Sequence, residues 1–206
     1  MTTNKKAGRP VGTSGKAAVI SDQELNRVLE SIKGKGHHVE RNTLVIILSN
    51  LLGLRAKELA SLKISDTFDE SPKKVLRLIS PYTKGSKHRD VSLEHVKVQK
   101  AISAYITYRI QEDGLTFNTE APLFRSQKGT AFSPNSMTRL LTDIYHRAGF
   151  KECSSHTGRR SLITKLAYKG VDINSIRQIA GHSSIATTQQ YIQDNPQLMA
   201  DILKSV

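Results

Sequence analysis

The chain has 206 residues, and its 31 lysines and arginines against 18 aspartates and glutamates give a formal net charge of +13 at pH 7. This length suits one well-filled domain with an arm rather than two full domains. The positive charge favours a polyanion as the binding partner, with nucleic acid preferred to a membrane surface, and the alternative is a basic protein with no special partner. The single cysteine excludes an intrachain disulfide, and the longest apolar run, LVIIL, is too short to cross a bilayer, so we expect a soluble, cytoplasmic protein.

The first residues predict a flexible basic arm, because residues 1–20 are rich in Gly, Ser, Thr, Lys and Arg and have almost nothing to bury. Within the arm, KKAGRP (Lys5, Lys6 and Arg9) resembles the core of an AT-hook, a short basic segment that lies in narrow minor grooves. The match is confined to Gly-Arg-Pro, so a solubilising tail is an equal alternative.

Helical signals begin at Ser21, where SDQE makes a capping box. The helix should end at the glycines of residues 34–36, and its buried stripe consists of Leu25, Val28, Leu29 and Ile32. Residues 42–52, NTLVIILSNLL, are too apolar for a surface helix and predict the central buried one. A break at Gly53 precedes a further helix in RAKELASL, with Arg55 at the break.

Two short runs, VLRLIS and HRDVSL, predict a β-hairpin, because PYTKGSK between them has hairpin length, turn residues and a strong positive charge. A helix over residues 94–111 should follow, and then LFRSQKGTAF as a second small β excursion. Ser133 and Pro134 open the next helix, which runs to Gly149.

The last third predicts helices over residues 157–168, 173–180 and 184–193, and a short final helix in NPQLMADILKSV. Gly181 has the place of a helix C-cap and Ser183 or Ser184 that of an N-cap, so His182 should lie in a tight turn. The predicted fold class is mostly α with a small antiparallel β-sheet.

Groups suited to phosphate chemistry lie at element boundaries, where side chains from different elements meet: Arg55, Lys84, His156 with Arg159, His182 and Tyr191. His156 and Arg159 are three residues apart, so at the start of one helix they share a face, and the helix N-terminus adds its own preference for anions. This pattern suits a phosphodiester.

Four motifs in this order, LLGLRAKEL, TKG, HTGR and AGHSSIATTQQY, resemble the catalytic domain of the tyrosine recombinases, the phage-integrase family. The resemblance covers residues 21–193 and implies that family's catalytic-domain fold for residues 21–206. It also implies a site-specific DNA recombinase that acts on double-stranded DNA.

The resemblance assigns a role to each position. Tyr191 would attack the scissile phosphate and form a 3′-phosphotyrosine bond, while Arg55 and Arg159 would hold the non-bridging oxygens. Lys84 would protonate the leaving 5′-oxygen, His156 would assist proton transfer and His182 would hydrogen-bond the phosphate. Glu58 would support Arg55, and no metal or cofactor is expected.

Simpler interpretations remain for these residues. Arg55 can be a plain ion-pair partner of Glu58, Lys87 in the same loop can take the place of Lys84, and either histidine can be a capping or core residue. SIRQIAGHSSIATTQQYI also scans as a helix-turn-helix, so a non-enzymatic transcription regulator or accessory factor is the alternative function.

Partners and organisation follow from the same resemblance. No separate N-terminal core-binding domain is expected, as in the short fimbrial phase-variation invertases, and the arm would contact DNA in its place. The expected DNA-binding residues are Lys5, Lys6, Arg9, Lys87, Arg89 and Arg160. We also expect a homo-tetramer linked by exchange of the C-terminal helix, whose apolar face consists of Leu198, Met199, Ile202 and Leu203. Accessory DNA-bending proteins are possible partners. The protein should be encoded by a bacterium or a phage and be associated with the nucleoid.

Overall fold

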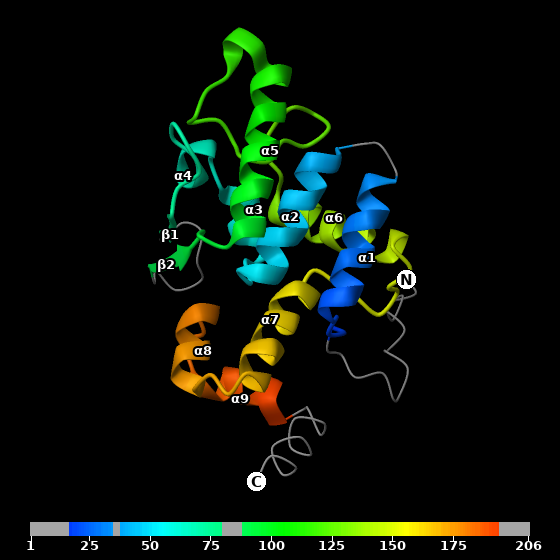
Figure 1. The fold of residues 1–206 in the computed structure, drawn as a ribbon, viewed down its shortest axis with the longest axis vertical. Helices are drawn as coiled ribbons and strands as arrows, with labels where there is room; N and C mark the ends of the chain where they lie inside the picture. Colours follow the sequence, from blue (N-terminus) through cyan, green and yellow to red (C-terminus); the bar gives the residue numbers. More distant parts are fainter. Residues whose placement is uncertain (1–16, 35–37, 80–87, 194–206) are drawn as a thin grey trace, which may run out of the picture.

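Helices make up most of the part of the chain that the structure describes, and Figure 1 shows their arrangement. The computed structural model describes residues 17–34, 38–79 and 88–193, and in residues 191–193 the backbone alone. The elements are α1 (Asp22–Lys33), α2 (Val39–Leu51), α3 (Ala56–Ser61), α4 (Ile64–Thr67), β1 (Val75–Leu78), β2 (Arg89–Ser92), α5 (Val96–Asp113), the 3₁₀ turn η2 (Gly114–Thr116), α6 (Pro134–Arg147), α7 (Thr157–Tyr168), α8 (Ile173–Ala180) and α9 (Ile185–Gln193). The predicted fold class is confirmed.

Helix α1 begins with the predicted capping box. Ser21 Oγ accepts a hydrogen bond from Glu24 N at 3.2 Å, and the Glu24 carboxylate accepts one from Ser21 N at 2.8 Å. Helix α2 begins at Val39, three residues earlier than predicted, and ends before Gly53, whose φ of +64° suits glycine. Because α2 packs against α1, α5, α6 and α7, it is the central helix that its apolar sequence predicts.

The sheet consists of β1 and β2, which pair antiparallel from Val75 opposite Ser92 to Leu78 opposite Arg89. The predicted hairpin is therefore confirmed, while the loop residues Lys84 and Lys87 lie outside the described residues. The second β excursion reduces to one bridge between Arg125 and Ala131, and the short helix α4 was not predicted.

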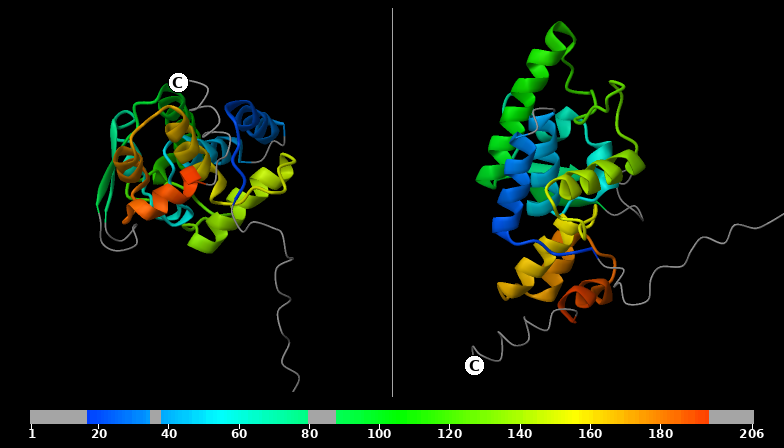
Figure 2. Two further views of the ribbon diagram at one scale, coloured as in Figure 1. Left: turned by 90° about the horizontal axis from the view of Figure 1, so that it is seen from below. Right: turned by 90° about the vertical axis from the view of Figure 1, so that its right-hand side faces the viewer.

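The three last helices lie at one end of the molecule, below the body formed by α1 to α6 (Figures 1 and 2). Helix α7 joins the two parts, because it packs against α2 on one side and carries α8 and α9 on the other. The main core surrounds α2, whereas Ile163, Ile176 and Ala180 form a small second cluster between α7 and α8. The start of α7, which carries HTGR, thus lies where the two parts meet.

Helix α7 crosses α2 closely at Gly158. A Cβ atom at this position would lie 2.6 Å from Ser49 Oγ and 2.8 Å from the Ser49 carbonyl carbon, and it would displace α2 or α7. We expect Gly158→Ala to lower the free energy of unfolding by about 1–3 kcal/mol, measured by urea denaturation. Gly34→Ala is the control, because a Cβ there meets nothing closer than 3.7 Å, and an equal loss in both variants would contradict the close-crossing explanation.

The segment before α1 is docked on α7, although the sequence assigns it to the flexible arm. Ile20 N donates to Ser161 Oγ at 2.9 Å, and Arg160 Nη1 donates to Ala17 O at 2.7 Å. Val19 and Ile20 explain the difference, since these apolar residues have a surface to bury that the rest of the arm lacks. Residues 1–16, with Lys5, Lys6 and Arg9, lie outside the described residues.

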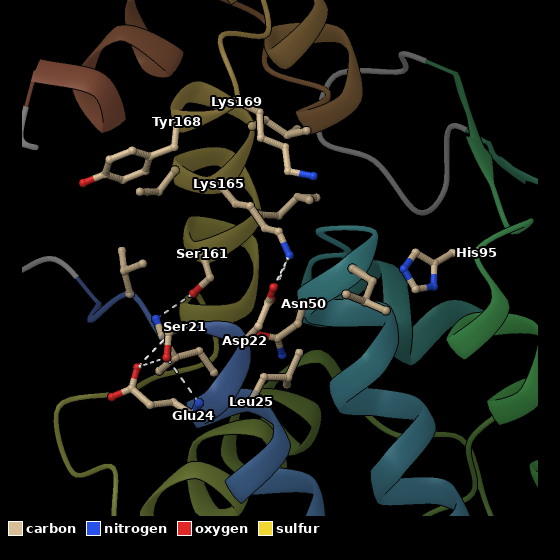
Figure 3. Close-up of a pocket in the computed structure, with 16 residues that line it drawn as sticks. Ser21, Asp22, Glu24, Leu25, Asn50, His95, Ser161, Lys165, Tyr168 and Lys169 are labelled. Carbon is tan, nitrogen blue, oxygen red and sulfur yellow. Dashed lines mark hydrogen bonds and ion pairs between the residues drawn. The ribbon is translucent and has the colours of Figure 1, made fainter. Parts of the chain in front are cut away.

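A cleft of about 640 Å³ opens between this segment, α1, the end of α2 and α7 (Figure 3). Lys165 reaches from α7 to the Asp22 carboxylate at 2.6 Å, and together with the Ile20 contact this fixes the outer face of α7 to α1. The residues that line the cleft include none of the predicted site residues. In the part of the chain that the structure describes, every helix is too short or too polar to span a membrane.

Candidate functional site

Three arginines from different elements meet at the C-terminal end of α8. Arg89 Nη1 donates to Ile179 O at 2.7 Å, Arg159 Nη2 donates to Ala180 O, and Arg55 Nη2 donates to Gly181 O at 3.0 Å. The last carbonyls of a helix have no partner within the helix and carry the negative end of its dipole. The end of α8 therefore holds cations from β2, from α7 and from the connection between α2 and α3.

Gly181 ends α8 as the sequence predicts, with φ 60° and ψ 45°, a left-handed conformation. A Cβ atom here would lie 2.7 Å from Arg89 Cδ. Glycine is thus required both for the turn and for the close approach of the arginine.

Glu58 is fully buried and binds two of the arginines. Its Oε1 lies 2.8 Å from Arg55 Nη1, its Oε2 lies 2.9 Å from Arg89 Nη2, and Oε2 also accepts from Arg55 N at 2.8 Å. The Arg55–Glu58 ion pair considered as the simpler interpretation does form. This ion pair leaves Arg55 able to bind a ligand, because its side chain is 33% exposed and its two described contacts occupy two of the five N–H groups of a guanidinium.

Arg159 is nearly inaccessible at 4% exposure, and its Nη1 donates to Gly53 O at 2.8 Å. His156 lies at the N-cap position of α7, one turn before Arg159, as its spacing predicts, and part of its surface is exposed. Partial desolvation, followed by the charges of Arg159 and Arg55, lowers the pKa of His156. The imidazole therefore lies in the positive field of both arginines.

His182 lies in the turn between α8 and α9, as predicted. It is buried, and its Nδ1 lies 2.9 Å from Thr188 Oγ1. Burial lowers its pKa to about 4, and Arg159, Arg55 and Arg89 act in the same direction. The ring is consequently neutral at pH 7, where it can exchange a hydrogen bond without adding charge.

This pKa predicts a pH dependence of stability. Between pH 6.5 and about 4 the unfolded chain binds a proton at His182 that the folded chain does not, so the free energy of unfolding should fall as the pH falls. The loss from this residue is on the order of 3 kcal/mol, and His156 contributes in the same direction. Urea denaturation from pH 7 to 4.5 measures it. His182→Asn should flatten the dependence and His88→Asn, at an exposed position, should not; equal slopes in all three proteins would contradict the assignment.

Positive charge gathers at this site. The contacts described above bring three guanidiniums to the end of α8, and Arg55 and Arg89 share the Glu58 carboxylate. A cluster of guanidiniums suits an anion, and phosphate oxygens match the planar N–H pairs of arginine. Among the described residues no three His, Cys, Asp or Glu side chains gather as metal ligands would.

The structure thus brings together five of the predicted residues: Arg55, Glu58, His156, Arg159 and His182. Tyr191 lies in α9, and its side chain is outside the described part, as are Lys84 and Lys87. Arg160 is half-buried, and its Nη1 donates to Ala17 O in the segment before α1.

Arg89 has a placement that the DNA-binding prediction did not anticipate. Its side chain is 10% exposed, and its guanidinium is turned inward onto Glu58 and Ile179. The convergence on the α8 carbonyls was not found from the sequence, because nothing local in HRDVSL marks a contact with residues about 90 positions later.

Comparison with known proteins decides the family. The model of the phage integrase family matches residues 18–197. The chain belongs to the phage integrase family. It is 30% identical to the tyrosine recombinase XerD of Oceanobacillus iheyensis over 191 residues, which cover 91% of this chain and 61% of that protein. It is 29% identical to the tyrosine recombinase XerA of Pyrococcus furiosus, covering 84% of this chain and 56% of that protein.

Solved structures agree with this membership of the phage integrase family. A crystal structure of a XerA recombinase covers 94% of this chain with a TM-score of 0.72 and 28% identity, and the match covers 66% of that chain. The XerH site-specific recombinase bound to its palindromic difH substrate in a post-cleavage complex covers 91% of this chain, and the match covers 52% of that chain, with a TM-score of 0.69 and 26% identity. The predicted tyrosine recombinase catalytic-domain fold is confirmed, and the regulator alternative is not favoured. The chain spans about three fifths of the length of the XerD and XerA relatives.

Proposed function

We propose that this chain cleaves and rejoins DNA strands as a site-specific recombinase, through a 3′-phosphotyrosine intermediate. The observation that carries the proposal is the convergence of Arg55 and Arg159 on the end of α8, beside His156 and His182, in a member of the phage integrase family. A site with this charge and these donors suits the transition state of phosphoryl transfer, in which negative charge grows on the non-bridging oxygens.

Tyr191 is the proposed nucleophile. Its oxygen attacks the scissile phosphorus and forms the new P–O bond, while the bond to the 5′-oxygen breaks and its electron pair leaves with that oxygen. His156 takes up the tyrosine proton, and Lys84 gives a proton to the departing 5′-oxygen. The reverse sequence, with a 5′-hydroxyl of another strand as the attacking group, rejoins DNA and releases Tyr191.

Arg55 and Arg159 are proposed to bind the non-bridging oxygens. Their guanidiniums stay charged at any physiological pH and are already held in place by α8, so little reorganisation is needed when the phosphate enters. His182, neutral at pH 7, would add a hydrogen bond to the same phosphate. We propose that these cations do the work that metal ions do in other phosphoryl-transfer sites.

Double-stranded DNA is the proposed substrate, in keeping with the difH-bound XerH structure. Residues 21–206 would act as the catalytic domain, and the basic residues of the segment 1–16 would contact the DNA backbone or minor groove. A homo-tetramer on paired sites, linked through the C-terminal residues, and accessory DNA-bending proteins extend the proposal. Light scattering of the DNA-bound chain tests the assembly, and a strictly monomeric complex on paired sites would refute it.

Covalent capture tests the proposal. End-labelled duplexes from the DNA that flanks the gene are incubated with the protein, and the reaction is stopped with SDS. We expect a labelled protein band that forms equally in EDTA, and a cleaved strand whose free 5′-hydroxyl accepts phosphate from polynucleotide kinase without prior phosphatase treatment. Specific binding of a fragment with no covalent band would instead support the non-enzymatic regulator, and a band abolished by EDTA would refute the metal-independent mechanism.

A further inference from the structure

We propose that Arg89 is a positioning residue, which acts through Glu58 to hold Arg55 in the orientation that receives the phosphate. This inference rests on the proposed function, because it gives Arg55 its role. It assigns to the first residue of β2 a part in catalysis without contact to DNA.

The contacts form a closed ring. Arg89 bridges the Glu58 carboxylate, at 2.9 Å, and Ile179 O, at 2.7 Å, while Arg55 bridges the same carboxylate, at 2.8 Å, and Gly181 O, at 3.0 Å. Each guanidinium therefore links α3 to the end of α8, and both links use the Glu58 carboxylate as their acceptor on α3. Such doubly held side chains lose little orientational freedom when a ligand binds.

Burial makes Glu58 dependent on both cations. Its side chain is fully inaccessible, and a buried carboxylate must be neutralised and hydrogen-bonded in place. Without Arg89, Oε2 would keep the backbone N–H of Arg55 but lose its cation, and the carboxylate could turn toward Arg55 alone. Arg55 would then be drawn into its own ion pair and away from the position that the ring gives it.

The neighbouring hairpin residue Arg77 provides a matched control. It lies in β1 opposite Asp90, its side chain is 74% exposed, and its Nε is 3.4 Å from the Asp90 carboxylate. Replacing Arg77 removes the same charge from the same hairpin without touching Glu58. A general electrostatic effect on DNA would therefore appear in both variants, whereas a positioning effect would appear in the Arg89 variant alone.

The first experiment compares Arg89→Met and Arg77→Met in the 206-residue chain, using the duplex that gives the covalent band. We expect Arg89→Met to form the covalent complex about 10- to 100-fold more slowly, the range typical of residues that orient a binding group, with an affinity for DNA within about 2-fold of the original. Arg77→Met should change neither quantity by more than about 2-fold. A fall in DNA affinity that accounts for the whole loss of rate would overturn the proposal.

Combination with Arg55→Lys separates positioning from a merely structural role. If Arg89 acts through Arg55, adding Arg89→Met to Arg55→Lys should slow the reaction little further, whereas independent roles predict that the two effects multiply. Multiplicative effects would refute the proposal. Should Arg89→Met fail to fold, Arg89→Lys retains a cation beside Glu58 but cannot reach both of its partners with a planar fork, and the same non-multiplicative result is expected.

A measurement without DNA keeps this inference apart from the proposed function. Nitrogen-15 NMR of the arginine side chains reports the rate of rotation of each guanidinium, and we expect Arg55 to rotate slowly in the original protein and faster in Arg89→Met. Faster rotation together with no covalent band in the original protein would mean that the recombinase proposal fails while the positioning role stands. Unchanged rotation of Arg55 would refute the positioning role whatever the activity.

Discussion

Replacing Tyr191 by phenylalanine should abolish covalent attachment to DNA, lowering the rate of strand cleavage by about 10⁴-fold or more. The reason is chemical: the phenol oxygen is the atom proposed to bond to phosphorus, and phenylalanine has none. Because the substitution removes a single atom from α9, the affinity for DNA and the melting temperature should stay close to those of the original protein. Gel analysis after SDS quenching measures attachment, and a filter-binding titration measures affinity.

Two other tyrosines serve as controls. Tyr168 is exposed on α7, and Tyr168→Phe should leave cleavage unchanged. Tyr145 is fully buried, receives a hydrogen bond from Asn50 Nδ2 at 2.8 Å, and has a pKa raised by that burial, so Tyr145→Phe should cost about 1 kcal/mol of stability and no activity. A covalent band that persists in Tyr191→Phe would show that another residue is the nucleophile.

Sequence reasoning succeeded where the deciding signals are local. Helix α8 has the predicted bounds because Asp172 caps its start, accepting from the backbone of residues 174 and 175, and Gly181 turns the chain at its end. Helix α1 follows from its capping box, and α2 from an apolar sequence that only the centre of a domain can accommodate. The order of the motifs along the chain then predicted which side chains share a site.

Sequence reasoning failed where the deciding contact is tertiary. Arg89 is a basic residue of the hairpin, which is why the sequence indicates contact with DNA. Its inward direction follows from Glu58 and Ile179, which lie 31 and 90 residues away in the chain. Residues 17–20 were assigned to the arm on composition, yet two apolar side chains and an exchange of hydrogen bonds with α7 are enough to dock them. Short segments of this kind carry too few residues for a pattern to be visible.

The common physical theme is that α8 ends at the site with carbonyls that have no partner within the helix. Its three last acceptors, Ile179, Ala180 and Gly181, gather guanidiniums that would otherwise repel one another. On the proposed function, the site is thus assembled before a phosphate enters, with Glu58 and a helix terminus supplying the negative charge. This arrangement makes the planar shape of arginine, and not its charge alone, the property that the site requires.

Arg159→Lys tests that requirement directly, and we expect it to slow strand cleavage by about 10²–10³-fold. Arg159 is 4% exposed, and its two terminal nitrogens donate to the carbonyls of two separate segments, Gly53 O and Ala180 O. A lysine ammonium has all its donors on one nitrogen, so it cannot keep both carbonyls and also donate to the phosphate with the geometry of a planar guanidinium. The charge is kept, so affinity for DNA should change by less than about 3-fold.

Arg27→Lys is the control for replacing an arginine by a lysine, because Arg27 lies on α1 and outside the candidate site, with its guanidinium 5.3 Å from the centre of the Phe150 ring. It should cleave at the original rate, while Arg159→Lys should bind DNA and fail to form the covalent complex at a useful rate. If Arg159→Lys cleaves normally, a positive charge at position 159 is enough for cleavage and the planar shape of the guanidinium is not required. The three α8 carbonyls would then stabilise the fold and not the transition state. If it loses affinity and rate together, Arg159 contributes equally to binding DNA and to the transition state, which again contradicts a role confined to the chemical step.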